Sequence, residues 1–216
     1  MNILIMGPAG AGKGTMSDKI VEKYGIPHIS SGDMFRAEIS ENTALGLAAQ
    51  EYMNKGLLVP DEITIEMVKQ RLTKPDCANG YLLDGFPRTL PQAEALEKMT
   101  QSLGIPLQVI LNLEVEFDEL AKRITGRRIC KNCNEIFNIH FRPSKVESVC
   151  DVCGYELSQR DDDTVERLQV RLQEYENQTI PVLEYFKDEG LAHRIDAGQS
   201  IEEVWIDVQK ALEDFA

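Results

Sequence analysis

The fold is decided by Gly7-Pro8-Ala9-Gly10-Ala11-Gly12-Lys13-Gly14-Thr15, a glycine-rich stretch near the start of the sequence. It follows a short apolar run, Ile3–Met6, and precedes apolar side chains at helical spacing that begin with Met16 and Ile20. The glycines let the backbone curl so that successive N–H groups point inward, and the next helix N-terminus adds partial positive charge. Lys13 supplies a full charge for the β- and γ-phosphates of a nucleotide. The stretch therefore predicts a phosphate-binding loop between a strand and a helix.

One position of this loop departs from the strict phosphate-loop pattern. A hydroxyl residue normally follows the lysine, whereas here Gly14 follows Lys13 and the hydroxyl comes one residue later, at Thr15. A glycine-rich turn can also be a plain connector between a strand and a helix. Strand, loop and helix nevertheless occur in the order that phosphate binding needs. We expect the loop to bind phosphate and leave a direct bond between Thr15 and magnesium unassigned.

Apolar runs alternate with helical patterns along the rest of the chain. The expected strands are Ile3–Met6, Tyr81–Leu83, Leu107–Leu113 and Ala192–Ile195. The expected helices run from Met16 to Tyr24, Ser31 to Arg36, Leu47 to Asn54, Asp61 to Leu72, Leu90 to Leu103, Val115 to Ile124, Val165 to an interruption at Pro181, and from a capping box at Ser200 and Glu203 to Leu212. Strands separated by helices imply an α/β fold with a parallel sheet covered on both faces.

The segment from about Arg127 to Asp163 breaks this alternation and reads as an inserted subdomain. Cys130-x2-Cys133 and Cys150-x2-Cys153 have the spacing of a four-thiolate zinc ribbon. Zinc would replace the hydrophobic core that so small a unit cannot build, and four protein ligands leave no open catalytic position. His140 is a rival ligand that the four thiolates make unnecessary. Cys77 falls outside the pattern and is expected to be a free thiol.

Composition limits the function classes. The 216 residues are 43% hydrophobic and 27% charged, which favours a folded unit over disorder. Lys and Arg total 23 against 36 Asp and Glu, a net charge of −13 that argues against nucleic acid or anionic lipid as a general partner. No apolar stretch approaches the length of a membrane span, and the start lacks a basic leader. We expect a cytoplasmic protein, and a monomer because no surplus apolar stripe stands out.

Asp84 and Arg88 stand at the expected carboxyl end of a buried strand. An acid there, beside a phosphate loop, can hold magnesium or its waters, although a lone Asp at a strand end is more often a turn cap. Ligands bind at the carboxyl ends of such strands, so Arg88 in Gly85-Phe86-Pro87-Arg88 is a candidate phosphate ligand. In a chain of net charge −13, arginines are needed to concentrate positive charge around phosphates.

Together these motifs resemble the adenylate kinase family, in its bacterial form with a zinc-binding lid, over essentially the whole chain. The motifs that carry the resemblance are the phosphate loop, Ser30-Ser31-Gly32-Asp33-Met34-Phe35-Arg36, Leu57-Leu58-Val59-Pro60-Asp61, Asp84-Gly85-Phe86-Pro87-Arg88, Gln92, Gly126-Arg127-Arg128 and Gln159-Arg160-Asp161-Asp162-Asp163. Ser31 departs from the Thr of many members but keeps the hydroxyl. The resemblance implies a P-loop kinase core (1–29, 60–126 and 164–216), a small helical AMP-binding subdomain (30–59) and a zinc-ribbon lid (127–163).

The resemblance also implies roles for individual residues. ATP would be bound by Gly10, Ala11, Gly12, Lys13, Gly14, Thr15, Arg123, Arg127, Ile136, Phe137 and the backbone of Gln199. AMP would be bound by Ser31, Arg36, Leu57, Leu58, Val59, Gly85, Phe86, Pro87, Arg88, Gln92, Arg160 and Arg171. The catalytic set would be Lys13, Arg88, Arg127, Arg160 and Arg171. Asp33 and Asp84 would order magnesium-bound waters, and Cys130, Cys133, Cys150 and Cys153 would bind structural zinc.

The implied reaction is ATP + AMP ⇌ 2 ADP, which maintains the balance of adenine nucleotides. An AMP phosphate oxygen is largely ionised near neutral pH, so no general base is needed and catalysis reduces to positioning and charge neutralisation. Gln92 favours adenine because one amide can both donate to and accept from the adenine edge. Three alternatives stay open on the residues alone. They are another nucleoside monophosphate kinase, a P-loop switch ATPase with a partner-binding zinc lobe, and a zinc-ribbon nucleic-acid binder.

Overall fold

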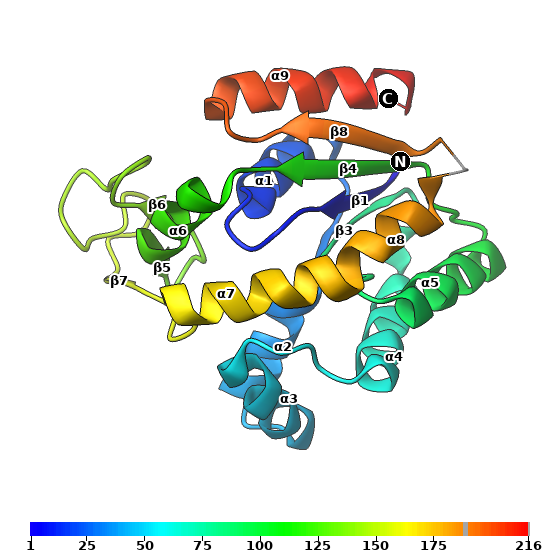
Figure 1. Ribbon diagram of the computed structural model, residues 1–216, viewed down its shortest axis with the longest axis horizontal. Coiled ribbons are helices and arrows are strands. Elements are labelled where there is room, and N and C mark those ends of the chain that lie inside the picture. Colours follow the sequence, from blue (N-terminus) through cyan, green and yellow to red (C-terminus); the bar gives the residue numbers. More distant parts are fainter. Residues whose placement is uncertain (188–189, 216) are drawn as a thin grey trace.

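The computed structural model describes residues 1–187 and 190–215. The strands of its main sheet are β1 (Asn2–Met6), β2 (His28–Ser30), β3 (Tyr81–Asp84), β4 (Val109–Glu114) and β8 (Ala192–Asp196). Within the described residues this sheet has five strands, all parallel, in the order β2-β3-β1-β4-β8 (Figure 1). The four expected strands are present. The three-residue strand β2 was not predicted, because so short a run shows no periodicity.

Helices follow the strands along the chain. Those around the main sheet are α1 (Lys13–Tyr24), α4 (Asp61–Leu72), α5 (Leu90–Leu103), α6 (Phe117–Thr125), α7 (Val165–Glu174), α8 (Ile180–Tyr185) and α9 (Ile201–Leu212), with short 3-10 turns at Pro75–Cys77 and Glu213–Phe215. The predicted capping box of α9 is confirmed, since Ser200 and Glu203 bond each other's backbone N–H groups. Helix α6 begins two residues later than expected, after Glu116.

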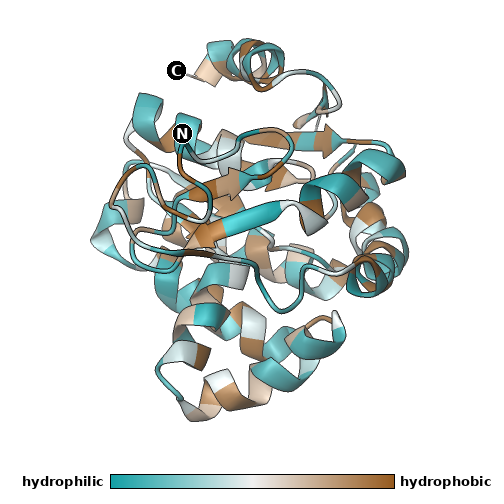
Figure 2. Cartoon of the chain, turned by 90° about the vertical axis from the view of Figure 1, so that its left-hand side faces the viewer, coloured by the Kyte–Doolittle hydropathy of each residue, from teal (hydrophilic) through white to brown (hydrophobic). Residues whose placement is uncertain are grey.

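Both faces of the main sheet are buried, as an α/β fold requires. Alternate residues of β1 point to opposite faces. Ile3 and Ile5 join one buried cluster with residues of the neighbouring strands and of α1, α6, α7 and α9. Leu4 and Met6 join a second cluster with residues of α4, α5 and α8. Figure 2 shows hydrophobic segments in the central strands and hydrophilic ones on much of the outer helix surface. The predicted fold class is confirmed.

Residues 31–55 form a pair of helices, α2 (Ser31–Ser40) and α3 (Ala44–Lys55), that lie together at the lower edge of Figure 1. Both are longer than expected, because α3 begins at Ala44, three residues before the predicted start, after its cap Thr43, and α2 continues to Ser40. They share a separate buried cluster of Phe35, Ala49, Val59 and Met67.

The cysteine-rich segment folds as a small antiparallel sheet of β5 (Arg127–Cys130), β6 (Ile136–Asn138) and β7 (Leu157–Ser158), in the order β6-β5-β7. It projects to the left of the main sheet in Figure 1. Its buried cluster consists of Cys130, Phe137, Cys150 and Leu157. So small a core fits the expectation that this segment needs another source of stability.

The predicted interruption at Pro181 is wrong in detail. Helix α7 passes through a π-helical turn, Tyr175–Thr179, directly into α8, where Pro181 lies in the first turn. Proline has no N–H and its ring crowds the carbonyl four residues earlier, so a widened turn replaces the regular helix just before it. In the part of the chain that the structure describes, no helix is both long enough and apolar enough to cross a membrane.

Candidate active site

The phosphate loop lies between β1 and α1, as predicted. Gly10 and Gly12 adopt φ values of 89° and 93°, a left-handed conformation that favours glycine. Lys13 is the first residue of α1, and its Nζ donates to the carbonyl oxygens of Gly7 and Pro8 at 2.8 and 3.0 Å. Burial lowers the pKa of Lys13 to about 8, and Asp84 opposes that shift. The ammonium group is therefore turned into the loop and close to a carboxylate.

Asp84 ends β3 directly beside β1, where it pairs in register with Ile5. Burial alone would raise its pKa, but His28, Lys13 and Arg88 outweigh burial and lower the pKa. His28 Nε2 lies 3.6 Å from Asp84 Oδ2 and is a buried nitrogen without a hydrogen-bond partner. An ionised carboxylate whose side chain is only 14% exposed, beside the loop, has the oxygen donors that a hydrated magnesium ion prefers.

Positive charge is concentrated next to this loop. Five arginines from separate parts of the chain interact electrostatically with one another, namely Arg36, Arg88, Arg127, Arg160 and Arg171. Burial and repulsion by neighbouring guanidinium groups lower the pKa of Arg160 and Arg171. Both nonetheless stay charged near neutral pH, because arginine starts from a pKa above 12. The predicted catalytic residues thus lie together.

Carboxylates pair with these arginines. Asp33 forms ion pairs with Arg36 and, at 3.7 Å, with Arg160. Asp163 is fully buried and pairs with Arg127, and Asp162 pairs with Arg171. The ion pairs that Asp162 and Asp163 form with these arginines were not predicted. The position of both acids just after Arg160 in the sequence could have indicated such pairs. His28 had no comparable signal, because it lies in the unpredicted strand β2.

The residues expected to bind AMP meet at the ends of β2 and β3. Ser31 Oγ and Arg88 Nε both donate to the carbonyl oxygen of Gly85, at 2.7 and 2.8 Å. Gly85 has φ 76°, and an added Cβ would lie 2.8 Å from Arg88 and 2.9 Å from Ser31. Phe86 and Pro87 are joined by a cis peptide bond. Arg88 N donates to Gln92 Oε1 at 2.8 Å, so Gln92 lies in the same group.

The other residues expected to bind AMP lie in the connection between α3 and α4. Leu57 is exposed, Leu58 is half-buried and Val59 is buried in the α2–α3 cluster. Of the three, Val59 therefore packs with α2 and α3.

The residues expected to bind ATP outside the phosphate loop are only partly brought together. Arg123 donates to the carbonyl oxygen of Ala197, in the turn that also holds Gln199, and its Nη1 lies 3.8 Å from the place of a Gly12 Cβ. Ile136 reaches the loop, since its Cδ1 would lie 3.3 Å from a Cβ on Gly14. Phe137 instead packs in the core of the small sheet. A contact between Phe137 and ATP would have to come from its backbone.

The four predicted metal ligands converge. The Sγ atoms of Cys130, Cys133, Cys150 and Cys153 all lie within 4.8 Å of one another, and three of their separations are 3.4–3.5 Å. Four thiolates bound to zinc at about 2.3 Å lie about 3.8 Å apart in a tetrahedron, so the donor set fits that ion. All four are free thiols, as is Cys77, which is buried outside the cluster.

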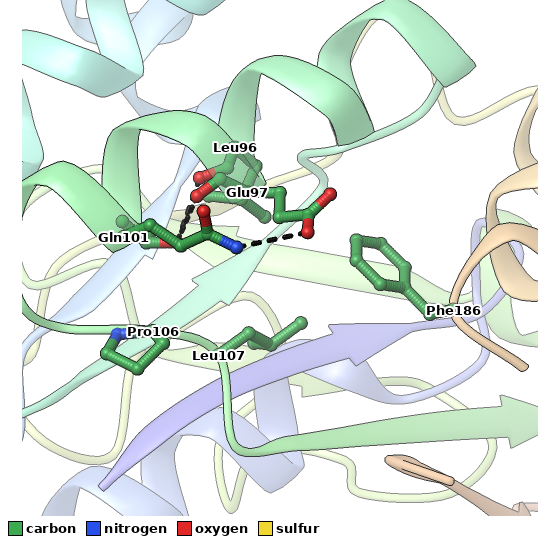
Figure 3. Close-up of a pocket in the computed structure, with 7 residues that line it drawn as sticks. Leu96, Glu97, Gln101, Pro106, Leu107 and Phe186 are labelled. Carbon is green, nitrogen blue, oxygen red and sulfur yellow. Dashed lines mark hydrogen bonds between the residues drawn. The ribbon is translucent and has the colours of Figure 1, made fainter. Parts of the chain in front are cut away.

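Two further cavities lie outside the arginine group. One of about 240 Å³ lies between α5, α8 and the start of β4, where Leu96, Pro106 and Phe186 line it (Figure 3). It contains none of the predicted site residues. The other, of about 990 Å³, runs along β8 and α9 and includes Glu119 and Gly198, which adjoin Arg123 and Gln199.

Comparisons with known proteins agree on one family. A family model described as adenylate kinase matches residues 5–191. Adenylate kinase of Carboxydothermus hydrogenoformans is 55% identical over 99% of this chain and 100% of its own length. Those of Thermodesulfovibrio yellowstonii and Bacillus licheniformis are 48% and 50% identical, over 99% and 98% of each chain respectively. With a phosphate loop, a parallel sheet and a matching family model, the chain belongs to the adenylate kinase family of nucleoside monophosphate kinases.

Proposed function

We propose that the protein catalyses ATP + AMP ⇌ 2 ADP with Mg²⁺, and that the reacting phosphates lie between Lys13 and the five arginines. The observation that carries this proposal is the gathering of Arg36, Arg88, Arg127, Arg160 and Arg171 beside the phosphate loop of an acidic protein. Guanidinium groups without a negatively charged ligand repel one another and would be expected to lie apart on the surface. Their grouping is expected where polyphosphate anions neutralise them.

The site divides into a donor side and an acceptor side in this proposal. ATP is held by the phosphate loop with its base beside Arg123 and the Gln199 turn. AMP is held by Ser31, Arg36, the 57–59 connection, Gly85–Arg88 and Gln92. Residues 30–59 act as the AMP-binding subdomain, and residues 127–163 act as the lid that covers ATP. Closure of the lid excludes water, which would otherwise hydrolyse ATP.

The chemical step follows from this arrangement. An AMP phosphate oxygen attacks the γ-phosphorus of ATP, and the bond from that phosphorus to the β,γ-bridging oxygen breaks, which leaves two ADP molecules. Lys13 and the arginines hold the two nucleotides in line and neutralise the equatorial oxygens. Asp84 and Asp33 would hold waters of the magnesium ion. When bound with ATP, Mg²⁺ supplies further charge neutralisation on the phosphates.

The proposal is tested by ³¹P NMR of product formation from MgATP with AMP, CMP, UMP or GMP as acceptor. Rapid ADP formation with AMP, and slow turnover of the others, is the expected result. Rapid transfer to CMP or UMP would show that the acceptor is a nucleoside monophosphate other than AMP. Release of free phosphate without acceptor preference would contradict kinase activity and favour a switch-type ATPase.

We propose that the cysteine cluster binds zinc and that the zinc is structural. Removing it with a chelator is expected to lower the melting temperature by at least about 5 °C, because the lid has only a small apolar core. Turnover at temperatures where the chain stays folded should change less. Calorimetry before and after chelation, with metal content followed by mass spectrometry, measures this.

Replacement of Cys77 by serine provides the matched control for the zinc experiment. That thiol lies outside the cluster, so the variant should retain its metal and the same chelation effect. An unchanged melting temperature after confirmed metal loss would contradict a structural role.

We also propose a cytoplasmic location, where thiols stay reduced for metal binding. We propose that the protein is a monomer, which light scattering can test.

A further inference from the structure

The Gln92 side chain is held in one orientation by two protein contacts. Its Oε1 accepts from the backbone N–H of Arg88 at 2.8 Å, and its Nε2 donates to Asp61 Oδ1 at 2.6 Å. The residue is only 2% exposed. A side-chain amide has two N–H groups and an oxygen with two lone pairs, so one donor and one acceptor remain for a ligand.

Asp61 and the backbone N–H of Arg88 both distinguish the two ends of this amide, and Asp61 is the one whose side chain can be changed. An ionised carboxylate only accepts hydrogen bonds, so it requires the NH₂ end of Gln92 to face it. Rotating the amide would place Gln92 Oε1 against Asp61 Oδ1 and the NH₂ group against the Arg88 N–H. Two hydrogen bonds would be replaced by an oxygen–oxygen and a donor–donor contact.

The position of Asp61 is itself fixed. Its Oδ2 accepts from Thr89 Oγ1 at 3.0 Å, and Thr89 is buried where it caps α5. Asp61 is the first residue of α4 and follows the 57–59 connection by one residue. The contact between Gln92 and Asp61 therefore joins two helix starts beside the group of residues proposed to bind AMP.

A fixed amide can select between purines of the same size. The Watson–Crick edge of adenine offers an acceptor at N1 and an amino donor at C6. Hypoxanthine offers the reverse, an N1–H donor and a C6 oxygen acceptor. Each edge pairs with only one orientation of a facing amide, and a site built to hydrogen-bond one edge rejects its complement strongly.

We propose that Asp61 is a specificity-determining residue, which acts through Gln92 by fixing the amide in the orientation that pairs with adenine and rejects 6-oxopurine nucleotides. The inference rests on the proposed function, in which Gln92 faces the AMP base. Asp61 is a positioning residue and does not touch the base.

The test compares AMP with IMP as phosphoryl acceptors, since the two differ chiefly in the edge that Gln92 would face. In Asp61→Asn the new amide can accept from or donate to Gln92, so only the Arg88 N–H still favours the original orientation and the rotated amide becomes more populated. The kcat/KM ratio of AMP to IMP is expected to fall about tenfold, mainly through KM, while kcat with AMP and KM for ATP stay near the unmodified values. Asp61→Ala should shift the ratio in the same direction, and melting curves verify that both variants are folded.

Glu62→Gln is the matched control, because Glu62 is the exposed neighbour in the same first turn and loses the same charge. It should leave the ratio unchanged. An equal shift in Glu62→Gln, or an unchanged ratio in both Asp61 variants while Gln92→Leu lowers it, would overturn the role of Asp61. If Gln92→Leu keeps the preference for AMP, Gln92 does not read the base and the proposed site is itself wrong. Failure of the unmodified protein to phosphorylate AMP would sink the proposed function.

Discussion

Replacing Lys13 with alanine is expected to lower kcat for ADP formation by about 10³-fold while the protein remains folded. Its Nζ lies inside the phosphate loop, 2.8 and 3.0 Å from the carbonyl oxygens of Gly7 and Pro8, where we propose that it binds the ATP phosphates. Removal of one preorganised donor at developing negative charge typically costs 10²–10³-fold, and this donor carries a full charge. Folding should persist, because burial of the ammonium group opposes its charge in the unliganded protein. Steady-state kinetics and a melting curve measure both effects.

The pH profile of the unmodified protein gives a second measurement of the same group. The pKa of Lys13 is lowered to about 8, so its charge is present below that pH and lost above it. Since kcat/KM reports the free enzyme, kcat/KM for MgATP should fall as pH rises through about 8. Lys98→Ala, which removes an exposed lysine of α5, is the control and should retain full activity. Near-normal turnover of Lys13→Ala would contradict the assignment.

Replacing Arg88 with alanine is expected to lower kcat/KM for AMP by about 10²–10³-fold. The guanidinium group lies at the end of β3 beside Asp84, and its Nε bonds the carbonyl oxygen of Gly85, near Ser31. Burial and the nearby Arg36 lower the pKa of Arg88, which means that the folded protein holds this charge at a cost. The melting temperature should therefore be unchanged or higher. Kinetics with AMP varied at saturating MgATP, together with calorimetry, measure the two quantities.

The Arg88→Lys variant separates the effect of positive charge from the effect of the planar guanidinium geometry. Arg88→Lys keeps a positive charge but loses the planar fork that binds two phosphate oxygens, so it should recover only a small part of the activity. Arg194→Ala removes an arginine whose side chain is 79% exposed on β8, and it should behave like the unmodified protein. An active Arg88→Ala variant, or a large loss of stability in it, would show that Arg88 has a structural role instead.

Local sequence patterns predicted the parts of the site that depend on spacing along the chain. The phosphate loop needs glycines and a lysine at fixed intervals, and the Cys130–Cys153 cluster needs paired thiols. Both form within short segments, and both are found as expected. The alternation of apolar runs likewise predicted the sheet class, because parallel strands buried on both faces must be apolar throughout.

Contacts between segments that are far apart in the sequence could not be predicted from such local patterns. Arg88 could be singled out from its place after a strand, whereas Arg127, Arg160 and Arg171 received their specific roles only through the family resemblance. Their meeting depends on how β5, the end of the small sheet and α7 are placed around the main sheet. The ion pair of Arg127 with Asp163 joins residues 36 positions apart, and the hydrogen bond between Gln92 and Asp61 spans 31. No periodicity encodes such distances.

The helix that runs through α7, the π-helical turn at Tyr175–Thr179 and α8 packs against the hydrophobic clusters on both faces of the main sheet. Leu168 and Leu172 of α7 pack with the cluster on one face, whereas Val182 and Phe186, at and just beyond α8, pack with the cluster on the other. A π turn holds about one residue more than an α turn, and each residue rotates the side chains by about 100°. The extra residue therefore resets the angular phase of the helix. At that changeover Thr179 Oγ1 donates to the carbonyl oxygen of Arg88 at 3.1 Å. The rotational register of the α7–α8 helix is thus tied to the backbone of Arg88, which we propose binds AMP.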